Sequence, residues 1–340
     1  MSKLRIVVSN FSRPTPGRLD FAGMWRLAQF PEPRPRLALF DQPFGWGFHL
    51  YALGVYLMDR GVAERVEFWD YSPQRRMSFL ANGVLKIEFR NEDDVAAYID
   101  RFGPPDLFFN HGVHGVPVLR MLDGRAFRVH VPTHRSPGSA PLEHAECFLV
   151  DGEDQLEGRS MLYIPVVNTR VIRPRDLAKE RDFIYLASCY EGKRHDLIVD
   201  AVRGTELTGH FHPVDPSQIE LSATRITTSA LDRADVVRLL QTSRIAVYPG
   251  DETSNPAAMW ECVAAGLPIV VNAAIEGGKH VVVPGLTGEL APEDSFVDVM
   301  RTVLATRHSY APREYFVEHW DTVRLIEGYL SFFQRSGWNP

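Results

Sequence analysis

Short runs of Val, Ile and Phe alternate along this chain with segments in which apolar residues recur at helical spacing. This alternation is typical of βαβ units, in which helices connect parallel strands. A first series of predicted strands comprises Arg5–Val8, Arg36–Phe40, Arg65–Trp69, Asp106–Asn110, Arg128–Val131, Cys147–Val150 and Leu162–Pro165. A second series comprises Asp182–Ala187, Leu207–His210, Ile245–Tyr248 and Ile269–Val271. The pattern therefore predicts an α/β protein with two doubly wound, Rossmann-like parallel sheets in tandem.

Helices and a linker divide the chain further. Phe48–Asp59, ended by Gly61, and Asp93–Arg101, ended by Gly103, have helical periodicity. The extended polar segment Pro165–Pro174 separates the two series of strands, and Glu314–Arg335 reads as amphipathic, aromatic-rich helix. We predict a first domain at residues 1–170, a second at 171–315, and a helical tail at 316–340 that crosses back to the first domain.

Composition and charge exclude several classes of function. The 340 residues carry a net charge of −6, and neither half has the basic surplus of a nucleic-acid-binding protein. Cys147, Cys189 and Cys262 are scattered without metal-binding spacing, which suits a reducing compartment. No apolar stretch has the length of a signal peptide or a membrane span. We expect a soluble cytoplasmic protein without a transmembrane segment or a nucleic-acid partner.

The turn after the predicted strand Ile245–Tyr248 carries the most candidate chemistry. Asn255 and Pro256 are suited to the N-cap and the first position of a helix that stops at Gly266. Glu261 is the one charge on that otherwise apolar helix, and burying a carboxylate without a partner costs several kcal/mol or so. Glu261 therefore either binds hydroxyl groups of a ligand or lies on a solvent-exposed stripe.

Lys193 and Arg194 begin a helix after the predicted strand Asp182–Ala187. Two cations at a helix N-terminus oppose the helix dipole, and an anion in the loop would offset that cost. A diphosphate is the obvious candidate for that anion. The alternative is a pair of solvated basic residues.

Glycine and histidine supply further candidates. Gly277-Gly278 lets backbone amides approach a ligand closely, and Gly45, Gly47 and His49 open a helix in the first half. Four histidines lie at or near predicted strand ends, namely His111, His114, His130 and His134. Their spacing matches no zinc motif, so we expect no metal site.

Taken together, these residues resemble the retaining family 4 glycosyltransferases, which have the two-domain GT-B fold. Ile245–Leu290 has the order of that family: strand, acidic loop, helix with Glu261, strand, Gly-Gly loop and Gly285–Gly288. Tyr185–Leu197 resembles the family's strand and lysine-bearing loop, and Ile164–Pro174 its interdomain link. Asp106–His111 and the strand leading to His134 resemble two elements that flank the donor sugar.

Three positions depart from the family's pattern. Thr253 holds the place of the first of two glutamates, for which Glu252 could substitute in a longer loop. Ser188 stands where an arginine usually precedes the lysine, so Arg194 is a candidate for the missing charge. His280 follows the Gly-Gly turn in place of a frequent glutamate.

The resemblance implies transfer of a sugar from a nucleoside diphosphate to an acceptor hydroxyl, with retention, without a metal and without any other cofactor. It implies catalytic roles for His134, Lys193 and Glu252; donor binding by Ser188, Arg194, Asn255, Glu261, Gly277 and Gly278; and an acceptor side at Gly45, Gly47, His49 and His111. The partners would be a nucleotide-sugar and a small-molecule, glycan or lipid-linked acceptor.

Two other classes share this pattern. A sugar-nucleotide 2-epimerase can have the same two-domain fold. A non-catalytic scaffold of that fold would fit the substitutions at Ser188 and Thr253. The identity of the donor sugar, its base and the acceptor stays open at this point.

Overall fold

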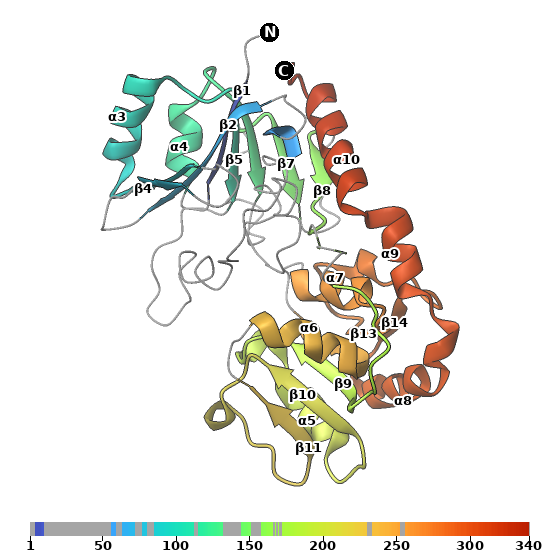
Figure 1. Ribbon diagram of the computed structural model, residues 1–340. Helices are drawn as coiled ribbons and strands as arrows, with labels where there is room; N and C mark the ends of the chain where they lie inside the picture. Colours follow the sequence, from blue (N-terminus) through green and yellow to red (C-terminus); the bar gives the residue numbers. More distant parts are fainter. Residues whose placement is uncertain are drawn as a thin grey trace. The chain divides into compact units, whose positions relative to one another are not determined.

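The computed structural model describes residues 4–9, 56–58, 63–71, 77–79, 85–111, 115–131, 144–150, 158–165, 167, 169, 172–229, 233–251 and 256–339. The chain divides into two compact units. Unit 1 comprises Met1–Gln42, Trp46–Val166 and Ile326–Pro340, and unit 2 comprises Pro43–Gly45 and Val167–Leu325. Each unit contains one predominantly parallel sheet (Figure 1).

Unit 1 contains a sheet with the strand order β3-β4-β2-β1-β5-β6-β7-β8 within the described residues. Its strands are β1 Leu4–Ser9, β2 Ala63–Tyr71, β3 Met77–Phe79, β4 Leu85–Phe89, β5 Leu107–His111, β6 Phe127–Val131, β7 Cys147–Val150 and β8 Ser160–Leu162. Neighbouring strands are parallel except β3, which is antiparallel to β4. Strands this apolar suit a parallel sheet, which is covered on both faces.

Helices α3 (Glu92–Phe102) and α4 (Val116–Met121) pack against this sheet. The Asn91 side chain caps α3 by accepting a hydrogen bond from the Asp94 amide, and Gly103 ends the helix at φ 81°. The apolar face of α3 joins Trp69 and Phe108 in the core of the unit. Sequence periodicity predicted this helix at Asp93–Arg101, within one residue of its observed ends.

Helix α10 (Thr322–Arg335) supplies aromatic side chains to unit 1 from Ile326 onward. The ring of Phe333 lies 5.5 Å from that of Phe109 in β5. The Tyr329 hydroxyl donates to the Ile164 carbonyl and accepts from the Ile164 amide, both at 2.8 Å. The aromatic residues of this segment therefore belong to a packed core.

Unit 2 contains a fully parallel sheet with the order β11-β10-β9-β12-β13-β14. Its strands are β9 Arg181–Leu186, β10 Thr208–His212, β11 Arg225–Thr228, β12 Ser243–Tyr248, β13 Ile269–Asn272 and β14 Gly288–Ala291. Its helices are α5 His195–Val202, α6 Arg233–Thr242, α7 Ala257–Ala264, α8 Phe296–Thr306 and α9 Pro312–Trp320. Short 3₁₀ turns are η4 Glu191–Lys193, η5 Pro216–Gln218, η6 Lys279–Val281, η7 Glu293–Ser295 and η8 Arg307–Ser309.

The observed strands confirm the predicted pair of doubly wound sheets and correct some details. The expected strand Leu162–Pro165 lies earlier, as β8. The strands β3, β4, β11 and β14 were not predicted. β3 has only three residues, β11 alternates exposed and buried residues, and β14 is short and half exposed. The expected strand Arg36–Phe40 and most of the helix Phe48–Asp59 lie outside the described residues.

Candidate functional site

The loops that follow β9 and β12 meet at the point where the strand order of unit 2 reverses. The chain leaves β9 toward β10 on one side and leaves β12 toward β13 on the other. A Cβ atom on Gly250, just after β12, would lie 2.9 Å from the carbonyl oxygen of Gly192 in the β9 loop. Only glycine permits so close an approach, and ligands of open α/β sheets bind at such a reversal.

Lys193 lies at this junction. It is 9% exposed and ends the turn η4. The Tyr185 hydroxyl donates to the Lys193 carbonyl at 2.6 Å, which fixes the backbone of the loop onto β9. The Lys193 ammonium lies 5.3 Å from the centroid of the Tyr190 ring. The alternative of a solvated lysine is therefore wrong, because the Lys193 side chain is buried although Tyr190 and Glu191 of the same loop are exposed.

Arg194 follows as the N-cap of α5, with φ 50° and ψ 45°. Its guanidinium contacts Glu293 at 2.6 Å, Asp196 at 3.4 Å and, more distantly, Asp251 at 3.9 Å. The hydrogen bond with Glu293, helped by the charge of Asp196, holds the pKa of Arg194 above its ordinary value. We expected a negative charge beside this helix start. The protein's own carboxylates supply part of it.

Glu261 projects from α7, the helix after β12. It is 4% exposed, so the alternative of a solvent-exposed stripe is wrong. Helix α7 begins at Ala257, one residue later than the sequence predicts, with Pro256 and not Asn255 as its N-cap. Gly266 ends the turn after α7 with φ 83°, as expected for a helix stop.

The Gly-Gly loop lies in the same unit, after β13. Gly278 has φ 78°, a conformation that favours glycine, and leads into η6. In η6 the His280 ring packs 5.4 Å from Trp260, the residue before Glu261. Burial lowers the pKa of His280 to about 4. Its Nε2 has no hydrogen-bond partner among the described residues, so this neutral imidazole is a candidate ligand contact.

Asn272 at the end of β13 is a further polar residue of this edge, which the sequence pattern does not strongly indicate. It is 1% exposed, its amide donates to the Pro249 carbonyl at 2.7 Å, and its Oδ1 accepts from the Ala274 amide. It therefore ties the loop before Gly250 to the next strand. A polar residue ending an apolar strand was the available clue.

Other predicted site residues lie at strand ends or outside the described residues. Ser188 is exposed in the loop after β9, and the backbone of His111 ends β5 in unit 1. Beside it, the amide of Asn110 lies 3.0 Å from His130 Nδ1, and burial lowers the pKa of His130 to about 4. Residues outside the described ranges are Gly45, Gly47, His49, His114, His134, Glu252, Thr253 and Asn255.

No group of three or more His, Cys, Asp or Glu side chains is arranged to hold a metal ion in the part of the chain that the structure describes. Among the same residues, no helix has both the length and the apolar character that a membrane crossing requires.

Comparison with solved structures identifies the fold. No family model and no curated protein sequence matches the chain. A sucrose-phosphate synthase from Thermosynechococcus elongatus matches with a TM-score of 0.72 and 14% identity, over 98% of this chain and 100% of that one. HepE of Anabaena, solved in complex with UDP and glucose, matches with a TM-score of 0.68 and 12% identity, over 97% and 99%. A glycosyltransferase from Rickettsia africae gives 0.67 and 11%, over the whole of both chains. The expected GT-B fold, two Rossmann-like domains, is therefore confirmed.

Proposed function

We propose that the protein is a glycosyltransferase that moves a sugar from a nucleoside diphosphate sugar to an acceptor hydroxyl. The observation that carries the proposal is the buried Lys193, held in a loop that touches Gly250 where the strand order reverses. A cation fixed at that position is suited to a phosphate-bearing ligand. The shared fold supports this, since HepE was solved with UDP and glucose.

The proposed chemistry is electrostatic. Departure of the leaving group builds negative charge on the diphosphate, and a buried cation held in place by its loop stabilises that charge without reorganising. Lys193 and the amides of η4 and the start of α5 would contact the diphosphate. Arg194 could reach it only by sharing or leaving Glu293, so we assign the main charge to Lys193 and a secondary role to Arg194.

The remaining donor and acceptor contacts are those that the resemblance in sequence implies. Glu261 would accept hydrogen bonds from the ribose hydroxyls, and its 4% exposure supports a desolvated contact. Ser188, Gly277 and Gly278 would line the donor site, and Glu252 or Asn255 would hold the donor sugar. From the first domain, His134 would contact that sugar, with Gly45, Gly47, His49 and His111 toward the acceptor. We further propose retention of the anomeric configuration, independence of metal ions and a cytoplasmic location.

A donor panel tests the proposal. We expect one of UDP-, GDP-, dTDP- or ADP-sugars to raise the melting temperature and to be consumed when an acceptor mixture is present. The anomeric configuration of the product, read by NMR, decides between retention and inversion, and added chelator should leave the rate unchanged. Conversion of the donor without acceptor would favour an epimerase. Failure to bind any nucleoside diphosphate in calorimetry would overturn the proposal in favour of a scaffold.

A further inference from the structure

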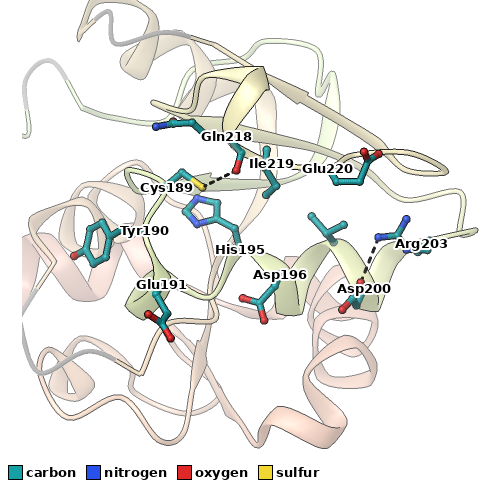
Figure 2. Close-up of a pocket in the computed structure, with 11 residues that line it drawn as sticks. Cys189, Tyr190, Glu191, His195, Asp196, Asp200, Arg203, Gln218, Ile219 and Glu220 are labelled. Atoms are coloured by element: carbon teal, nitrogen blue, oxygen red, sulfur yellow. Dashed lines mark hydrogen bonds and ion pairs between the residues drawn. The ribbon is translucent and has the colours of Figure 1, made fainter. Parts of the chain in front are cut away.

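A pocket of about 480 Å³ lies within unit 2, beside the loop that follows β9 (Figure 2). Three segments line it: the loop after β9, helix α5 and the connection between β10 and β11. That connection spans residues 213–224 and contains only the short turn η5, whereas parallel strands are usually joined by a helix. One flank of α5 therefore stays uncovered, and the pocket has the size of a small-molecule site.

The interior of the pocket is apolar with one buried polar group. Val199 of α5 and Ile219 of the connection contribute apolar surface. The His195 imidazole is 3% exposed, packs on the Tyr185 ring at 4.6 Å, and lies beside Cys189 in Figure 2. Burial lowers the pKa of this imidazole to about 4, so the ring is neutral at physiological pH and adds no charge to the wall of the pocket.

The rim of the pocket is polar and predominantly acidic. Asp196, Asp200 and Glu220 stand around it with Gln218, and the one basic residue of the lining, Arg203, is already engaged by Asp200 at 3.3 Å and by the Ser222 carbonyl. Hydrogen bonds from Ser222 hold the pKa of Glu220 below its ordinary value, so this carboxylate stays charged at neutral pH. Such a rim repels anions, including phosphates and uronic acids.

An aromatic side chain stands at the mouth. Tyr190 is 55% exposed, although tyrosine is a large residue that is usually more buried. An exposed ring beside carboxylate and amide groups offers an apolar face for C–H groups and acceptors for hydroxyls. Among small ligands, a neutral sugar ring combines those two surfaces and no charge. A metal ion is a poorer fit, because no three metal-binding side chains converge here or elsewhere among the described residues.

We propose that this pocket is a binding site for a neutral sugar, separate from the nucleotide site. Hydroxyls would bond to Glu220 and Gln218, while the ring would pack between Ile219 and the Tyr190 face. The inference does not depend on the proposed transfer reaction. It does place a second carbohydrate against the loop that carries Lys193, where a glycan portion of the acceptor, or a free sugar, could be held.

The test is a titration of the full-length protein with glucose, galactose and N-acetylglucosamine, followed by saturation-transfer NMR and calorimetry. Glucuronate, which has the same ring with a carboxylate, is the charged control. We expect at least one neutral sugar to bind and glucuronate to bind at least tenfold more weakly. If none of the three neutral sugars binds, or if glucuronate binds equally well, the proposal is wrong.

A pair of variants assigns the binding to this pocket. Ile219→Trp should fill the pocket and weaken sugar binding at least tenfold, while Leu221→Trp, on the same connection but outside the lining, should not. UDP affinity, measured on the same samples, should be equal in both variants. Loss of sugar binding in both variants, or in neither, would overturn the assignment. A protein that binds the sugar but no nucleoside diphosphate would instead refute the proposed function and leave this site standing.

Discussion

At the scale of single residues, Glu261 is the most direct test of the donor site. Glu261→Gln should weaken UDP binding by about 1.5–3 kcal/mol, or roughly 10- to 150-fold, because a charged hydrogen-bond acceptor for the ribose becomes a neutral amide. The side chain keeps its volume, so the melting temperature should change little. Calorimetry with UDP measures the effect, and Glu314→Gln on the exposed face of α9 is the matched control. Equal UDP affinity in both variants would remove Glu261 from the site.

Lys193 should act differently, on turnover more than on binding. Lys193→Met keeps the aliphatic stem that lies near the Tyr190 ring but removes the charge. Because negative charge on the diphosphate grows as the leaving group departs, we expect kcat to fall by about 10²–10³-fold with a smaller change in nucleotide affinity. Steady-state kinetics with the donor found in the panel measures both. Arg301→Met, on the exposed side of α8, should be kinetically silent. A variant with normal kcat would contradict the proposed role.

At the scale of elements, the contact between the β9 and β12 loops is predicted to be intolerant of a single methyl group. In Gly250→Ala the new Cβ would lie 2.9 Å from the Gly192 carbonyl oxygen, so one loop must shift. We expect a lower melting temperature and weaker UDP binding, with a cost of about 1–3 kcal/mol typical of overpacking.

Gly192→Ala is the control for this pair. Its Cβ would meet only a Tyr190 ring carbon at 3.7 Å, an ordinary contact, so the fold should tolerate it. If both variants unfold at the wild-type temperature, the loops do not press against each other as described. If Gly192→Ala is the more damaging variant, the steric explanation is wrong.

At this scale, features whose signals lie within a few residues of the sequence could be predicted, and features that depend on distant residues could not. The strand, helix and glycine stop around α7 were predictable because apolar periodicity and Gly266 act over a few residues. The ion pair between Arg194 and Glu293 could not be predicted, because Glu293 lies 99 residues away and nothing in the local sequence indicates their proximity. The predicted N-cap of α7 was also wrong by one residue, since Asn255 and Pro256 both suit a helix start.

The pocket beside α5 could not have been predicted from the pattern of hydrophobic and polar residues. A cavity arises where a covering element is missing, and the replacement of a helix by η5 between β10 and β11 leaves no positive sequence signal. His195 likewise reads from sequence as one more polar residue at a helix start. Its importance comes from burial against Tyr185 and Phe211, which belong to two different strands.

At the scale of the whole molecule, buried neutral histidines predict sensitivity to mild acid. Burial lowers the pKa of His130 in unit 1, and of His195 and His210 in unit 2, from 6.5 to about 4. All three side chains are less than a tenth exposed. In the unfolded chain these imidazoles take up a proton near pH 6.5, whereas in the folded protein they do so only near pH 4. Between those values the unfolded state binds more protons, so the stability of both units falls as the pH falls.

The free energy of unfolding should therefore be highest above pH 6.5 and decline steadily toward pH 4, by up to about 3 kcal/mol for the deeply buried His130 and by less for His195 and His210. Urea denaturation at a series of pH values between 8 and 4.5, roughly the window of the two pKa values, measures the slope. His195→Phe keeps a ring against Tyr185 but cannot be protonated, so its stability should fall less steeply in this range. His308→Gln alters an exposed histidine and should retain the wild-type slope. A stability that is flat from pH 7 to pH 5 would show that these imidazoles take up protons in the folded protein as readily as in the unfolded chain.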